Sequence, residues 1–254
     1  MSESPAPTPI APGAPEAGGN SAGFFQNLLD VYVSPREAFT RIATRPAWIL
    51  PAAAYVVLTV IFVGTWMSRM DYREFMQTQI EASGQAERLT AEQREQAIEM
   101  QAGFMPVLLG LSGTLGPVVS LLVVAGLLLA IYRFFYAASV TWPQSLAVTS
   151  WVFFATGLVS TPLLLAMMEL KGYWNLNPQD ALQTSLALLV DKATTAKPLY
   201  ALLGSIDLFS IWIVFLLATG YAAVIRRSTS SALWGVVVPW ALLVLGKVVW
   251  AAIF

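Results

Sequence analysis

The chain has 254 residues, of which 57% are hydrophobic and 11% are charged. Soluble domains carry about 25% charged residues, so this composition predicts an integral membrane protein. The net charge of −1 gives no reason to expect a nucleic-acid partner. The absence of Cys and His excludes disulfides, thiol chemistry and His-dependent catalytic or metal sites.

The N-terminal part of the chain divides into a tail and an amphipathic segment. Residues 1–23 are rich in Pro, Ala and Gly and lack the basic and apolar regions of a signal peptide, so we expect a disordered tail. Residues 24–46 carry apolar side chains at helical spacing and predict two amphipathic helices on the cytoplasmic face of the membrane. Ser34 is expected to cap the second helix and Pro35 to occupy its first turn.

Five apolar stretches are each long enough to cross a bilayer as a helix, which takes about 20 residues. They cover residues 47–67, 113–132, 145–168, 205–225 and 232–254. Residues 47–254 are therefore predicted to form an all-α membrane domain with five transmembrane helices. The apolar run leading into the second span contains Gly113, Gly116 and Pro117, which predict either a kinked, tilted or broken entry or close packing of small residues.

Two longer loops are predicted on the side opposite the N-terminus. Residues 68–103 are polar and helix-forming, with a break at Gly84 and a capping-box pattern at Thr90, so we expect two helical arms continuous with the first and second spans. The arms are either a solvated spacer or a docking surface for another protein. Residues 171–204 contain leucines that share one helical face, and an interfacial helix beginning near Pro178 is expected there.

Basic residues near the ends of the spans set the expected orientation. Arginines are dense in the short segments on the N-terminal side, whereas the basic residues opposite are spread over the two long loops. This density favours a cytoplasmic N-terminus and a C-terminus on the outer side. Arg36, Arg41 and Arg45 are also candidate contacts to anionic lipid head groups, although orientation alone accounts for such charges.

One cation, Lys247, lies within the apolar run of the fifth span. The fourth and fifth spans are joined by a short turn and should pack antiparallel, which places Asp207 and Lys247 about one helical turn apart in depth, near 5 Å. The sequence leaves three interpretations open. Lys247 snorkels to the outer head groups, forms an intramembrane ion pair with Asp207, or serves in transport.

Two segments of the sequence resemble those of a known membrane-protein family. Residues 34–52 read SPREAFTRIATRPAWILPA, and residues 142–165 read WPQSLAVTSWVFFATGLVSTPLLL. Both are similar to the YIP family, the Ypt- and Rab-interacting membrane proteins with a Yip-one domain, and the Ala- and Pro-rich composition suggests a bacterial member. The resemblance covers about residues 35–254. It implies five spans, a cytoplasmic N-terminus and a membrane adaptor rather than an enzyme. Some bacterial relatives look like accessories to ATP-driven efflux transporters.

These observations lead to two functional hypotheses for a multi-pass protein of the bacterial inner membrane. The first is a non-enzymatic adaptor that binds membrane lipids and other membrane proteins, with self-association as a homo-oligomer left open. The alternative is a small transport or lipid-handling protein whose path is lined by Lys247, Asp207 and the second span. The sequence contains neither a phosphate-binding loop nor a dinucleotide-binding fingerprint, so we expect no cofactor.

Overall fold

The computed structural model describes residues 23–82, 88–182, 184–192 and 194–253. All of the predicted tail except Gly23, and the predicted break at Gly84, therefore lie outside the described residues. Within them the chain is helical and holds no β-strand beyond an isolated bridge between Ser185 and Asp207. Five helices are long and apolar enough to cross a membrane, which confirms the predicted all-α class with five spans. They are α3 (Ile49–Arg69), α5 (Ala91–Phe134), α6 (Trp142–Lys171), α9 (Leu208–Ile225) and α10 (Thr229–Ile253).

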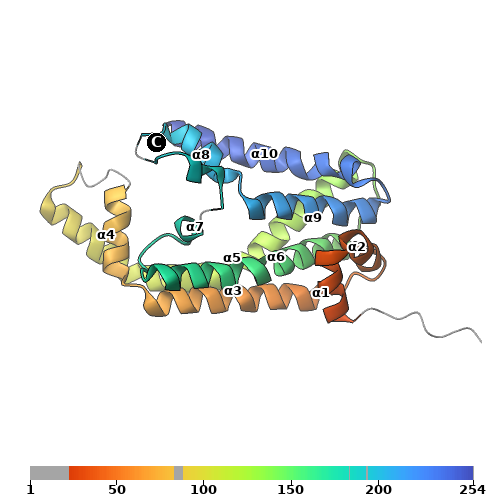
Figure 1. Ribbon diagram of the computed structural model, residues 1–254, viewed down its shortest axis with the longest axis horizontal. Helices are drawn as coiled ribbons and strands as arrows, with labels where there is room; N and C mark the ends of the chain where they lie inside the picture. The colour runs from red at the N-terminus through yellow and green to blue at the C-terminus, as the bar shows by residue number, and fades with distance from the viewer. Residues whose placement is uncertain (1–22, 83–87, 183, 193, 254) are drawn as a thin grey trace, which may run out of the picture.

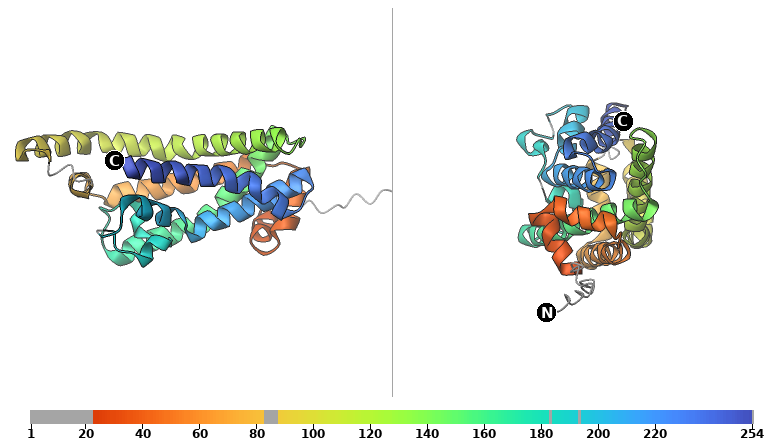
Figure 2. Two further views of the ribbon diagram at one scale, coloured as in Figure 1. Left: turned by 90° about the horizontal axis from the view of Figure 1, so that it is seen from above. Right: turned by 90° about the vertical axis from the view of Figure 1, so that its right-hand side faces the viewer.

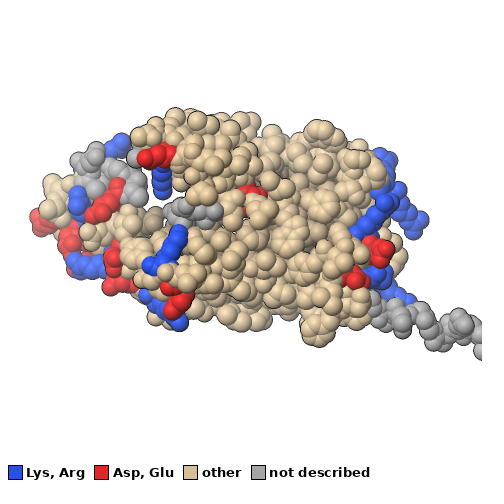
Figure 3. Space-filling model, viewed as in Figure 1, with Lys and Arg blue, Asp and Glu red and all other residues tan. Residues whose placement is uncertain are grey.

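The spans are arranged in two parts that meet at one end of the molecule (Figure 1). α3 and α6 pack side by side in one part, α9 and α10 form the other, and α5 runs along the whole length of the molecule (Figure 2). We call the two ends the α1–α2 end and the α4 end, after the helices found there. Charged side chains gather at both ends and leave between them a band in which few are seen (Figure 3). The remaining helices are α1 (Phe24–Val33), α2 (Pro35–Thr44), α4 (Tyr72–Ala82), α7 (Pro178–Ala181), the short 3₁₀ helix η2 (Leu186–Leu189) and α8 (Lys197–Ser205).

The two amphipathic helices α1 and α2 pack into the bundle, where they contact α6 and α9. Phe39 is fully buried, and the Tyr32 hydroxyl, whose pKa is raised by burial, donates a hydrogen bond to the carbonyl oxygen of Ala155 at 2.7 Å. Pro35 occupies the first turn of α2 as expected, but the Ser34 side chain makes no capping hydrogen bond. The apolar faces of these two helices are therefore buried in part against the protein and not only against a membrane surface. An amphipathic pattern cannot distinguish the two arrangements, because protein core and lipid both accept an apolar face.

The helix α5 has 44 residues and is about 66 Å long, more than twice the thickness of the hydrocarbon core. It runs unbroken through Gly113, Gly116 and Pro117, so the broken entry predicted from these residues is wrong. The capping box at Thr90 is present, and the second arm is continuous with its span as predicted. The first arm, α4, is separate from α3. Its first backbone N–H groups donate to the carboxylate of Asp71, which lies in the turn between the two helices.

The loop between α6 and α9 differs from its prediction. Instead of one interfacial helix from Pro178, it contains the short segments α7 and η2, and a further helix, α8, begins at Lys197 within the segment that was predicted as loop. The backbone N–H of Leu186 donates to the carbonyl oxygen of Ile206 at 3.1 Å. This pairing, with the bridge between Ser185 and Asp207, holds the loop against the start of α9.

Buried apolar side chains form two clusters, one at each end of the molecule. The cluster at the α1–α2 end is built by residues such as Phe39, Tyr132 and Trp151 from both parts of the bundle. The cluster at the α4 end is centred on Trp66 and Met168, and among the described residues its buried members come only from the α3–α7 part of the chain. The two parts of the bundle therefore share a buried apolar core at the α1–α2 end.

Glycines lie where two spans approach each other closely. A Cβ atom added at Gly113 of α5 would lie 2.8 Å from the side chain of Val63 in α3. One added at Gly220 of α9 would lie 2.5 Å from Val148 in α6. Small residues let membrane helices pack at such distances. Close packing, the alternative interpretation of the glycines in the second span, therefore applies at Gly113.

The substitution Gly113→Ala is expected to destabilise the protein by about 1–3 kcal/mol, because the stiff, β-branched Val63 has little freedom to move away. The matched control is Gly116→Ala in the same helix, where an added Cβ meets nothing within 4 Å. The measurement is the thermal unfolding of both purified variants in one detergent. Equal melting temperatures for the two variants would contradict the packing contact.

Candidate functional site

A cavity of about 570 Å³ lies between the two parts of the bundle. Its walls come from α6, from the segment around α7, from the junction of α8 and α9, and from α10. Asp207 and Lys247, the candidate ion pair of the sequence analysis above, both line this cavity. Most of the remaining lining is apolar, including Leu164, Trp240 and Leu243. The fold thus brings the two predicted site residues to one place.

Asp207 is the N-terminal cap of α9. Its carboxylate accepts hydrogen bonds from the backbone N–H groups of Phe209 at 2.9 Å and Ser210 at 3.1 Å, and from the Ser210 hydroxyl. A carboxylate in this position is stabilised both by these bonds and by the helix dipole. Its negative charge is therefore accommodated within α9 itself and needs no cation from α10. The sequence signal for this role is an Asp directly before an apolar run.

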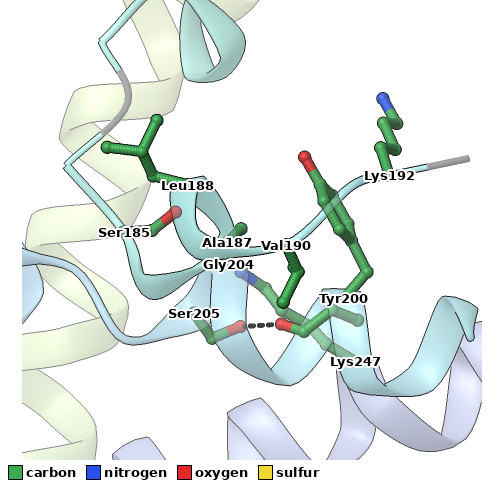
Figure 4. A pocket seen from close by; sticks show the side chains of 10 residues that line it. Ser185, Ala187, Leu188, Val190, Lys192, Tyr200, Gly204, Ser205 and Lys247 are labelled. Atoms are coloured by element: carbon green, nitrogen blue, oxygen red, sulfur yellow. Dashed lines mark hydrogen bonds between the residues drawn. The ribbon is translucent and has the colours of Figure 1, made fainter. Parts of the chain in front are cut away.

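Lys247 forms no ion pair with Asp207 or with any other residue in the described part of the chain. Its side chain reaches from α10 toward a second cavity of about 530 Å³ between η2, α8 and α10 (Figure 4). This second cavity adjoins the first, and the two share the residues Ser185, Gly204, Ser205 and Lys247. Lys247 thus faces a hollow rather than a protein counter-ion.

The three N-terminal arginines have different environments. Arg41 of α2 pairs with Asp30 of α1 and donates from Nε to the side chain of Asn27 at 3.3 Å, so its charge joins the two helices. Arg36 and Arg45 are exposed at the α1–α2 end. Contact of these arginines with lipid head groups stays a prediction. Arg36 and Arg45 are better placed for it than Arg41, because Arg41 is already paired with Asp30.

At the α4 end, α4 and the N-terminal part of α5 form a braced pair of helices, in the region predicted as two helical arms. Arg73 of α4 pairs with Glu95 and lies 3.7 Å from Glu99 on the N-terminal part of α5. Beneath these pairs Phe75, Met76 and Ile80 of α4 form a buried apolar seam with Ile98 of α5. The base of the arm is fixed to α6 by an ion pair and to the following loop by a hydrogen bond. These contacts are Arg69 with Glu169, and the Trp66 Nε1–H donating to the carbonyl oxygen of Trp174 at 3.0 Å.

The chain matches one protein-family model, that of the Yip1 domain, over residues 29–251. The match covers four of the five spans completely and the fifth up to residue 251. It also contains both segments, 34–52 and 142–165, on which the resemblance to the YIP family rested. No curated protein and no solved structure matches the chain.

The contact between α1 and α2 gives a test of the arginine assignments. Arg41→Gln removes the partner of Asp30, and we expect α1 to open more often, with about two- to fivefold faster cleavage by chymotrypsin at the exposed Phe25. Arg36→Gln is the control, because Arg36 is exposed on the same helix and forms no ion pair with a described residue. Equal cleavage rates in the two variants would show that the Arg41 pair does not hold α1.

Proposed function

The chain belongs to the Yip1 domain family, and we propose that it acts as a non-enzymatic membrane adaptor that binds and organises partner membrane proteins. Family membership and five apolar helices make it a multi-pass membrane protein. The finer form of the proposal is an accessory role beside an ATP-driven efflux transporter in a bacterial inner membrane. The N-terminus, α1 and α2 are then cytoplasmic, and the α4 end lies outside.

The observation that supports an adaptor is the braced arm formed by α4 and the first turns of α5. A solvated spacer needs no buried apolar seam between its helices, yet Phe75 and Ile80 are 7% and 3% exposed against α5. A docking surface gains from such a seam, since a surface already held in shape loses less conformational entropy when a partner binds. The ion pairs of Arg73 add to the same rigidity.

The outward side of the arm presents a ridge that no other described element covers. Gln96, Met100 and Phe104 are exposed and follow each other at four-residue spacing, so they share one face of α5. The ridge changes from polar to apolar along the helix as it approaches the span. A partner that is itself a membrane protein has a matching change along its own helices, and can contact the arm and the span together.

A photo-crosslinking residue at position 96 tests this proposal in native membranes. We expect it to give an adduct of one discrete mass with another membrane protein, identified by mass spectrometry after purification in mild detergent. The matched control is the same crosslinker at position 245, because Leu245 is 56% exposed on α10 and is not part of the arm. A protein adduct of the same mass from both positions, or none from position 96, would count against a docking arm.

The proposed orientation can be tested because the chain has no cysteine of its own. Thr44→Cys places a thiol at the α1–α2 end and Gln77→Cys places one on α4, both at exposed positions. In intact cells, we expect a membrane-impermeant maleimide to label position 77 and not position 44, with both labelled after permeabilisation. The reverse pattern in intact cells would place the arm in the cytoplasm.

A small transport or lipid-handling protein is the second candidate. The cavity of about 570 Å³ favours it, because this cavity places Asp207 and Lys247 among apolar walls within the membrane part of the bundle. An adaptor has no use for this cavity. The braced arm, conversely, has no role in moving a substrate through the bundle.

A further inference from the structure

The cavity of about 530 Å³ at the α4 end combines charge with hydrogen-bond donors. Lys247 enters it from α10, with its amine beside Gly204 of α8, and Lys192 stands on the opposite side next to Tyr200 (Figure 4). The Lys192 amine lies 5.8 Å from the centre of the Tyr200 ring. Two lysines thus line one hollow of a chain whose net charge is −1.

The donors around this cavity have no acceptors in the described part of the chain. The amines of Lys247 and Lys192 and the hydroxyls of Ser185 and Tyr200 form no hydrogen bond or ion pair there. Two ammonium groups and two hydroxyls suit an anion with several oxygen atoms, because charge-assisted hydrogen bonds to such an anion are short and strong. A phosphate group has this chemistry.

The neighbouring carboxylate does not supply the missing negative charge. Asp207 lines the adjoining cavity, but its oxygens accept from the backbone and side chain at the start of α9. An ionised lysine within a membrane helix is costly unless it finds a counter-charge or reaches the head groups. Lys247 lies about 9 Å along α10 from Ile253, so its amine is close to head-group depth.

The surroundings of the cavity are apolar and exposed, which distinguishes a lipid from a free anion. Leu188 and Leu189 of η2 are 62% and 79% exposed, and Leu199 and Leu202 of α8 are 47% and 39% exposed. A free phosphate makes no use of these leucines. The acyl chains of a lipid whose phosphate sits between the two lysines can run along them.

We propose that this cavity binds the head group of an anionic phospholipid, with its phosphate held by Lys247 and Lys192 and its acyl chains against the leucines of η2 and α8. This proposal rests on the second candidate function, that of a small transport or lipid-handling protein. It names an anionic phospholipid as the ligand of that function. It does not require the adaptor role. The bound lipid supplies the counter-charge that the protein itself does not give to Lys247.

The test uses the full chain, purified in a neutral detergent and titrated with phosphatidylglycerol, phosphatidylcholine or inorganic phosphate. Tryptophan fluorescence follows thermal unfolding. We expect phosphatidylglycerol to raise the melting temperature saturably, by about 5–10 °C, with little effect of the other two. An equal rise with phosphatidylcholine would overturn the requirement for an anion. An equal rise with inorganic phosphate would overturn the assignment to a lipid.

Substitutions of lining residues test whether the rise in melting temperature comes from lipid bound in this cavity. Lys247→Gln is expected to lose most of the phosphatidylglycerol shift, and Lys247→Arg to keep it. Lys171→Gln, at the same end of the molecule but outside the lining, is the control that keeps the full shift. If Lys247→Gln does not unfold cooperatively, Lys192→Gln in the exposed loop is used instead, with about tenfold weaker half-saturation expected. A full shift in the lysine variants would overturn the proposal.

The crosslinked adduct at position 96 is measured in the same lysine variants. Its yield should be unchanged when the lipid response is lost, because the arm and the cavity share no residues. Failure of the lipid proposal and failure of the adaptor proposal are therefore distinguishable.

Discussion

The first half of α6 is almost completely buried, and the rest of the molecule is arranged around it. The helices α1, α2, α3, α5 and α9 all contact α6. A polar group at such depth is costly unless it finds a partner within the protein. The Ser145 hydroxyl donates to the carbonyl oxygen of Ala125 at 2.6 Å and is bonded to the Tyr221 hydroxyl, and Thr149 donates to the carbonyl oxygen of Ser145 at 2.9 Å. These bonds join α5, α6 and α9, so the α1–α2 end is fixed by a shared polar and apolar core.

The opposite end is organised differently because no comparable helix fills it. Among the described residues, α8, α9 and α10 supply none of the buried members of the cluster around Trp66. The loop between α6 and α9 occupies this region instead, and both cavities that contain Lys247 lie against it. The braced arm projects from the same end. The candidate binding surfaces are therefore found where the bundle is least constrained by its own core, while the α1–α2 end supplies the rigid base.

Hydropathy predicted the spans well because about 20 apolar residues are a physical requirement for crossing a bilayer. It left α8 within the loop before the fourth span, because a helix of nine residues is too short to meet the length that a span requires. Asp207 before an apolar run was an available signal for the start of α9. The unbroken course of α5 escaped prediction because membrane helices tolerate Gly and Pro when neighbours compensate. The pairing of Arg73 with Glu95 depends on how α4 and α5 face each other, and the periodicity of a single helix does not contain that information.

Asp207 and Lys247 illustrate two ways of keeping a charge within a membrane protein. Asp207 is stabilised by the backbone at a helix start, a solution that needs no other molecule. No equivalent group faces Lys247 in the described part of the chain, although its position near the C-terminal end of α10 is electrostatically favourable. A phosphate bound there contacts α10 through Lys247 and the η2–α8 loop through Lys192. It would hold α8 against α10 and so set the width of the α4 end, the same end from which the arm projects.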